Sequence, residues 1–161
     1  MRAESVVVPV RGAMMRRHLD RHPSMASIVR EIDLDASAEF VWAALCDIGA
    51  PHTRVARGFV IATTIEPGAR TVTFANGLTA RELIVGLDEA RRRFAYSIVA
   101  GRATHHNASF QVFATGAQSC RVAWITDVLP DDLREPFARM VDAGVAAVKQ
   151  TVEADFAAGR R

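Results

Sequence analysis

The stretch RTVTFANGLTARELIVGL, residues 70–87, contains one of the strongest local structural signals of this 161-residue chain. Alternating apolar and polar residues lie on both sides of Asn76-Gly77, a dipeptide strongly favoured in two-residue β-hairpin turns. The stretch therefore predicts two antiparallel strands, Arg70–Ala75 and Thr79–Leu87, joined by a tight turn.

Further strands are predicted on both sides of this hairpin. Upstream, Phe59–Ile65 is separated from it by the turn signal Glu66-Pro67-Gly68, and Ile28–Leu34 alternates near the start of the regular pattern. Downstream, the predicted strands are Arg93–Ala100, His106–Thr115 and Ser119–Leu129. Successive strands joined by short turns indicate an antiparallel meander.

Two helices complete the predicted α+β fold. Asp35-Ala36-Ser37 offers capping oxygens for a first helix, which Gly49-Ala50-Pro51 ends. A second helix of about twenty residues starts near Pro136 and spans roughly 30 Å, enough to cross a small sheet. Its apolar stripe consists of Phe137, Met140, Val141, Gly144, Val148, Val152 and Phe156. We expect a curved antiparallel sheet of about seven strands wrapped around this long C-terminal helix.

Composition excludes several classes of protein. Half the residues are hydrophobic, 24% are charged and the net charge is only +2, with no basic helix face that would indicate nucleic-acid binding. No apolar run is long enough to span a membrane, so a cytoplasmic protein is expected. Cys46 and Cys120 lie in no CxxC or Cys/His cluster. We therefore expect no metal or cofactor and favour two free thiols, with a disulfide left open.

The first residues differ from the rest of the chain. Residues 1–24 are rich in arginine and show no sustained period, which favours a loosely ordered basic leader. A basic arm that touches a partner or membrane surface is one alternative. A translation start at Met14, Met15 or Met25 is another. Residues 25–158 are expected to form one domain.

The order strand, helix, long meander, long helix resembles that of the SRPBCC superfamily, also called START or Bet v 1-like, and in particular its polyketide cyclase/dehydrase-like branch. The resemblance covers most of the chain between Ile28 and Glu153. It rests on Ala38-Glu39-Phe40-Val41-Trp42, Asp47, Gly68 with Arg70, Gly77, Arg81-Glu82-Leu83, Asp88, Tyr96-Ser97-Ile98, Trp124 and Pro130.

The resemblance implies a helix-grip fold with a pocket between the concave face of the sheet and the C-terminal helix. Some members of the superfamily carry or sense lipids and hormones, and others cyclise or dehydrate polyketides. Gly77-Leu78-Thr79-Ala80 is similar to the gate loop of plant abscisic-acid receptors. It is shorter and lacks their proline, so a hormone-style latch is not expected.

Strand alternation predicts which side chains line the pocket. Residues with even numbers form the apolar face on most strands, whereas the resemblance alone places Ala80, Glu82 and Ile84 inward. The predicted ligand-binding residues are Val72, Phe74, Ala80, Glu82, Ile84, Tyr96, Ile98, Ala108, Phe110, Trp124, Phe137, Met140, Val141, Gly144 and Val148. The small side chains of Ala80, Ala108 and Gly144 favour open space, although a solid core has the same composition.

Glu82 is the residue on which two interpretations conflict. Plain alternation turns Leu83, Val85 and Leu87 inward and leaves Glu82 in water, whereas the resemblance buries it. An inward Glu82 needs a partner, and Arg70, Tyr96 and His106 are the candidates. Its pKa would rise with burial, which would suit it to proton transfer.

His105-His106 is interpreted as a pair of loop histidines, of which His106 is a candidate base.

The leading hypothesis for the function is a protein that binds a hydrophobic or aromatic small molecule. The alternative is a cyclase, aromatase or dehydratase that uses Glu82 with Arg70, Tyr96 or His106. A third hypothesis is an interaction module with a solid core. The sequence leaves a homodimer open.

Overall fold

A computed structural model of the chain describes residues 26–99 and 101–160. The predicted leader of residues 1–24 lies outside these ranges. The strands are β1 Ala26–Leu34, β2 Val60–Glu66, β3 Ala69–Phe74, β4 Thr79–Asp88, β5 Arg93–Ile98, β6 His105–Gly116 and β7 Ser119–Leu129. The helical elements are α1 Ala38–Cys46, the π-helical turn η1 Pro51–Val55, the 3-10 turn η2 Asp131–Leu133 and α2 Arg134–Ala157.

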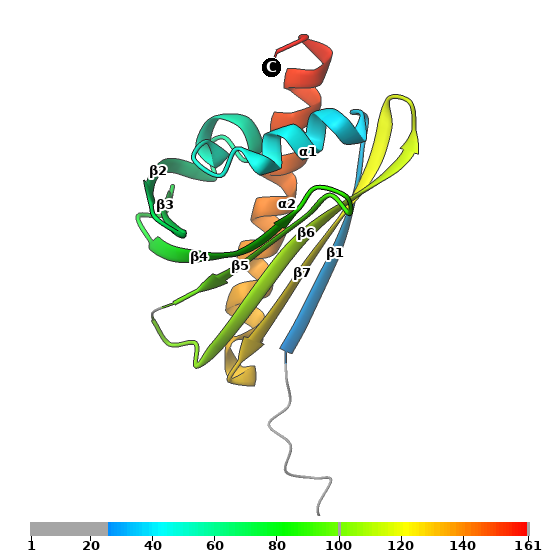
Figure 1. Cartoon of the computed structure of the whole chain (residues 1–161). Helices are drawn as coiled ribbons and strands as arrows, with labels where there is room; N and C mark the ends of the chain where they lie inside the picture. The colour runs from blue at the N-terminus through cyan, green and yellow to red at the C-terminus, as the bar shows by residue number, and fades with distance from the viewer. Residues whose placement is uncertain (1–25, 100, 161) are drawn as a thin grey trace, which may run out of the picture.

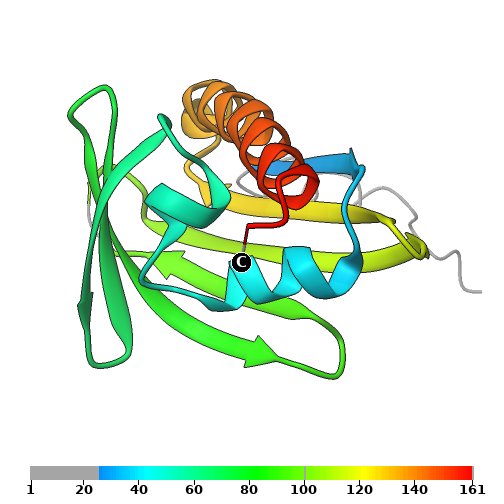
Figure 2. The same cartoon turned by 90° about the horizontal axis from the view of Figure 1, so that it is seen from above.

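The seven strands form one antiparallel sheet in the order β1-β7-β6-β5-β4-β3-β2. The meander from β2 to β7 is as predicted, and Gly77 takes the positive φ of +83° that the β3–β4 turn requires. Strand β1 pairs with β7 at the edge of the sheet. The predicted α+β fold, a curved sheet that grips a long helix, is confirmed. Figures 1 and 2 show α2 lying along one face of this sheet, while the end of the sheet formed by β2 and β3 turns towards the side on which α2 lies.

The helices begin and end for identifiable reasons. The Ser37 hydroxyl caps α1 by accepting a hydrogen bond from the Phe40 backbone N–H, as the capping signal predicts. Helix α1 ends at Cys46, earlier than the predicted Gly49, because Asp47 has non-helical dihedrals. Helix α2 has 24 residues and starts at Arg134, so Pro136 lies in its first turn. The turn η1 has no periodic apolar pattern, and the sequence did not predict it.

The apolar core lies between the inner face of the sheet and the two helices. Most of the even-numbered residues predicted to face inward on β5, β6 and β7 are buried there, with Phe94, Phe110, Val112 and Val122 among them, whereas Ile98 is half-buried. The opposite face is not uniformly exposed. Ser109, expected among the polar outward residues, is buried between its cross-strand neighbours Ala95 and Ile125, because its short side chain is shielded by the strands beside it.

Other described features bear on the class of protein. Cys46 and Cys120 are free thiols, and burial raises the pKa of each to about 11. Within residues 26–99 and 101–160, no three His, Cys, Asp or Glu side chains lie close enough together to hold a metal ion. No helix in the same ranges combines the length and the apolarity that crossing a bilayer requires.

Candidate functional site

A cavity of about 460 Å³ lies between the sheet and α2. Its volume falls in the range of small-molecule binding sites, roughly 300–1,000 Å³. Of the predicted ligand-binding residues, those on its wall are Val72, Phe74, Ala80, Glu82, Tyr96, Ile98, Phe110, Trp124, Phe137, Met140, Val141 and Val148. Their function in binding stays a prediction.

Three predicted lining residues do not reach the cavity: Ile84, Ala108 and Gly144. Ala108 is fully buried in the sheet between Tyr96 and Thr126, its partners on the neighbouring strands. Ile84 packs against the core beside a break in the β4–β5 register. A Cβ atom at Gly144 would lie only 2.6 Å from Cη2 of Trp124. The glycine therefore provides room for the indole ring, not for a ligand.

The sequence did not identify part of the cavity wall. These residues are Leu45, Pro51, Val55, Ala56, Phe59, Val60, Leu78, Thr79, Gly101, Arg102, Ala103, Thr126, Leu133 and Pro136. Phe94, which strand alternation predicted to face inward, also lines the cavity. Thr126 has the same even numbering, so alternation could have identified it too. The turn η1 gave no such signal, because Pro51, Val55 and their neighbours follow neither a helical nor a strand period.

Glu82 faces inward, on the cavity wall, and only 4% of its surface is exposed. Its Oε2 accepts a hydrogen bond of 2.7 Å from Nε of Arg70, and the two residues are direct partners across β3 and β4. Arg70 also donates from Nη1 to the Ile48 carbonyl. Burial raises the pKa of the Glu82 carboxyl above its ordinary value, while the Arg70 cation acts against that rise.

Aromatic rings surround this ion pair. The Arg70 guanidinium carbon lies 5.1 Å from the centre of the Phe94 ring and 5.9 Å from that of Tyr96. Phe94 and Tyr96 are stacked, and the Tyr96 ring centre is 6.2 Å from that of Phe110. These contacts between the cation and the ring faces stabilise Arg70 in an apolar setting. Burial raises the pKa of the Tyr96 hydroxyl, so it stays protonated near neutral pH.

His106 lies within strand β6, not in the predicted loop, because pairing with β7 continues through His105 to Leu129. Its Nδ1 accepts a hydrogen bond of 3.0 Å from the Ile98 backbone N–H. Burial lowers the pKa of His106 to about 4, so the ring is neutral near pH 7 and its proton is on Nε2. His106 lines the cavity next to Phe137, with ring centres 5.4 Å apart, whereas His105 is exposed.

Two further polar atoms of this region are unpaired in the part of the chain that the structure describes. There, neither Nε1 of Trp124 nor Oγ1 of Thr126 makes a hydrogen bond, although both atoms are buried and both residues line the cavity. Leaving a buried polar group unpaired costs about 1–3 kcal/mol. The polar groups of the cavity wall therefore include the Arg70–Glu82 ion pair and, on β7, the unpaired atoms of Trp124 and Thr126.

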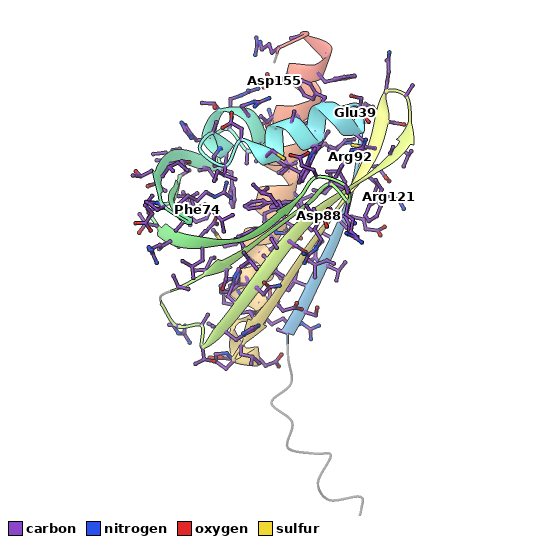
Figure 3. The ribbon with its side chains drawn as sticks, viewed as in Figure 1. Glu39, Phe74, Asp88, Arg92, Arg121 and Asp155 are labelled. Carbon is purple, nitrogen blue, oxygen red and sulfur yellow. The ribbon has the colours of Figure 1, made fainter. Side chains whose placement is uncertain are left out.

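A second acid–base pair holds the wall formed by η1. Nη1 and Nη2 of Arg57 donate to the carboxylate of Asp155 at 2.6 and 2.9 Å. The Arg57 backbone N–H donates to Oγ1 of Thr151. Figure 3 shows Asp155 near the C-terminal end of α2, away from Phe74 on the β3 side of the sheet. These contacts fasten the segment after η1 to α2 and so keep Pro51 and Val55 in place.

Leu78 and Arg102 mark the mouth of the cavity. Both line it, yet 59% of the Leu78 surface is exposed and Arg102 forms a surface ion pair with Asp132 at 3.1 Å. Nearby, Nδ2 of Asn76 contacts the Met140 sulfur at 3.9 Å. The cavity thus opens between the β3–β4 hairpin, the segment around Arg102 and the first turns of α2.

Comparison with known proteins gives one family and a set of similar folds. A sequence profile described as polyketide cyclase / dehydrase and lipid transport matches residues 25–158. No curated protein matches the chain in sequence.

Solved structures share the architecture at low sequence identity. The aromatase/cyclase Zhui from Streptomyces sp. R1128 superimposes with a TM-score of 0.65 at 21% identity, covering 86% of this chain and 100% of that one. Norcoclaurine synthase from Thalictrum flavum, as a point mutant with a transition-state analogue, gives 0.63 at 23%, covering 80% and 94%. An uncharacterised protein from Bacillus thuringiensis gives 0.71 at 17%, covering 79% and 98%. These similarities show the fold.

Proposed function

Because the chain belongs to the polyketide cyclase / dehydrase and lipid transport family, we propose that its cavity binds a hydrophobic or aromatic small molecule. The observation that carries this proposal is the hollow of about 460 Å³ between the sheet and α2, walled mainly by apolar side chains. We propose that residues 25–158 form the binding domain, the range that the family profile matches.

The chemistry of the wall supports binding driven by removal of apolar surface from water. Each CH₂ group that a ligand buries contributes about 0.8 kcal/mol. Phe74, Phe110, Phe137 and Met140 supply broad apolar contacts. The few polar groups orient the bound molecule, as in most sites for small ligands.

Uptake of the neutral dye Nile red tests this proposal. The full chain is expected to bind one dye molecule with a rise and a blue shift of its fluorescence, because the cavity excludes water. The variant Ala80→Phe places a ring in the cavity and should weaken binding at least tenfold. Ala62→Phe adds the same ring to an exposed position on β2 and serves as the matched control. Equal binding by both variants, or no binding by the unaltered chain, would contradict the proposal.

The second candidate function is a cyclase or dehydratase, favoured by the position of Glu82 beside Arg70 and Tyr96. In this scheme the Glu82 carboxylate removes a proton from a carbon between two carbonyl groups, and Arg70 steadies the resulting enolate. The enolate carbon forms a bond to another carbonyl of the same molecule, and Glu82 returns the proton to the new alkoxide. Loss of water then completes a dehydrative cyclisation.

Turnover of a poly-β-keto thioester distinguishes the two functions. If the chain is a cyclase, Glu82→Gln should abolish its acceleration of ring formation while the variant still binds Nile red. A chain that only binds would leave the rate of ring formation equal to that in buffer. Unchanged turnover in Glu82→Gln would exclude Glu82 as the base.

A further inference from the structure

Two unpartnered polar atoms on β7 belong to the cavity wall. Within residues 26–99 and 101–160, Nε1 of Trp124 and Oγ1 of Thr126 have no hydrogen-bond partner, although only 8% of the Trp124 surface and 2% of the Thr126 surface is exposed. The two residues are two positions apart on one strand, so their side chains leave the same face of the sheet. Buried polar groups in native proteins are almost always paired, so these two atoms are available to hydrogen-bond a molecule bound in the cavity.

The neighbours of these two atoms are mainly donors. Ala108 separates Thr126 from Tyr96 across the sheet, and its methyl group takes little space between them. The Trp124 indole lies near enough to the Tyr96 hydroxyl to oppose the rise in its pKa, without a hydrogen bond of normal geometry. His106 is two residues from Ala108, and its Nδ1 is occupied by the Ile98 N–H, so Nε2 is a donor. An indole N–H can only donate, and the two hydroxyls can do so.

The charged groups of the cavity wall are already paired. Among the described lining residues, Arg70 is bound to Glu82 inside the cavity, and Arg102 is bound to Asp132 at its mouth. A ligand carboxylate at the donor groups of β7 would therefore lose its hydration without gaining a free cation. A neutral acceptor oxygen incurs no such penalty.

This inference rests on the proposed function. We infer that Trp124, Thr126, Tyr96 and His106 form a donor corner that binds a neutral acceptor oxygen of the ligand, a ketone or hydroxyl oxygen on a flat hydrocarbon skeleton. The donor corner thus determines the specificity of the cavity. It selects oxygen-bearing neutral molecules over plain hydrocarbons and over carboxylates of the same size.

Three probes that share one naphthalene ring test the inference by isothermal titration calorimetry of the full chain at pH 7.5. They are naphthalene, 2-acetylnaphthalene and 2-naphthoate. We expect 2-acetylnaphthalene to bind at least tenfold more tightly than naphthalene, because its carbonyl gains one net hydrogen bond in a dry site and its methyl group buries apolar surface. We expect 2-naphthoate to bind more weakly than 2-acetylnaphthalene. Variants of the donor groups isolate the contribution of the hydrogen bond.

Variants assign the preference to the donor corner. Thr126→Val removes the hydroxyl at constant shape, and Trp124→Phe removes the indole N–H. Each should weaken binding of 2-acetylnaphthalene about fivefold. Trp124→Phe also removes apolar contact, so it should weaken both probes, and 2-acetylnaphthalene more than naphthalene. Thr126→Val, which keeps the shape of the wall, should change binding of naphthalene by less than twofold. Thr64→Val makes the same exchange at an exposed position on β2 and should change neither. If Trp124→Phe does not fold, by circular dichroism, Thr126→Val carries the test alone.

The outcomes separate this inference from the function on which it rests. If naphthalene and 2-acetylnaphthalene bind equally, water already satisfies these atoms and the inference is wrong, while the proposed binding function stands. The inference is also wrong, and the binding function again stands, if both variants weaken the two probes equally or if 2-naphthoate binds most tightly. If none of the three probes binds, the proposed function fails and the inference fails with it.

Discussion

Two acid–base pairs of nearly equal length lie in different environments of this molecule. Arg70–Glu82, at 2.7 Å, lies inside the cavity, with side chains only 8% and 6% exposed. Arg57–Asp155, at 2.6 Å, joins the segment after η1 to α2, with side chains 38% and 11% exposed. Burial raises the pKa of Glu82, whereas the hydrogen bond from Arg57 lowers that of Asp155. The environment, not the distance, sets the direction of the shift.

This contrast separates a structural pair from a functional candidate. Asp155 stays ionised, accepts from both Arg57 and Arg160, and fastens elements together. Near neutral pH, the neutral and charged forms of the buried Glu82 carboxyl are closer in free energy than those of a solvated carboxyl. This is the condition under which a group can both accept and release a proton. The same contrast determines how each pair should respond to mutation and to pH.

The largest expected effect comes from removing one cation at a time. Arg70→Met leaves the Glu82 carboxylate buried without its partner and should lower the free energy of unfolding by about 3–5 kcal/mol at pH 7. Arg57→Met makes the matched change at the partly exposed pair, where water can replace the lost contacts, and should cost about 1–2 kcal/mol. Urea unfolding followed by circular dichroism measures both. An equal or larger loss in Arg57→Met would overturn the comparison.

The next effect concerns His106 and the acid side of the stability profile. Its pKa is lowered from 6.5 to about 4 by burial, so the unfolded chain takes up this proton more readily than the folded one. The stability that the neutral ring contributes is complete above pH 6.5 and is lost as the pH falls toward 4. The loss should amount to about 3 kcal/mol.

His106→Asn keeps an acceptor for the Ile98 N–H but does not titrate. The difference in unfolding free energy between the unaltered chain and this variant should therefore shrink as the pH falls from 6.5 to 4. A difference that stays constant over this interval would show that His106 titrates equally in the folded and unfolded chains.

The smallest effect is the pH dependence of stability that each carboxylate contributes, which should have opposite signs for Asp155 and Glu82. Asp155→Asn should lower the free energy of unfolding by about 1–2 kcal/mol at pH 7. Because the folded pKa of Asp155 is lowered, the stability that its carboxylate contributes is present above pH 3.8 and is lost at lower pH. The folded pKa of Glu82 is raised above 4.5, so its contribution is complete below that pH and falls as the pH rises.

Unfolding of Glu82→Gln and Asp155→Asn between pH 3 and pH 7 measures these two dependences. Relative to the unaltered chain, Glu82→Gln should gain stability as the pH rises, whereas Asp155→Asn should lose it. Slopes of the same sign would mean that the two carboxylates are in equivalent environments.

The sequence predicts the strands, turns and helices more fully than it predicts the residues that line the cavity. Asn76-Gly77 and the alternating runs around it determine the hairpin, and Ser37 determines the start of α1, because turns and caps depend on local residues. The direction of Glu82 could not follow from alternation, because β4 has apolar residues on both faces. Val85 and Leu87 are exposed on the outer face, and the β4–β5 register shifts between Ile84 and Gly86.

Other parts of the cavity depend on contacts between distant segments. Gly144 accommodates the ring of Trp124 across the core, which no local pattern encodes. The position of η1 depends on Arg57 reaching Asp155, 98 residues away along the chain. Such pairs become visible only when the sheet and α2 are placed together, which is why the sequence did not identify Pro51 and Val55 as part of the wall.

Native mass spectrometry of the gently purified chain tests the central claim that the space between the sheet and α2 holds a small molecule. We expect one apolar compound to be retained per chain, by the unaltered protein and by Ala62→Phe. The cavity-filling variant Ala80→Phe should lose it. Bare protein in every preparation, with no uptake of added naphthalene, would contradict the claim.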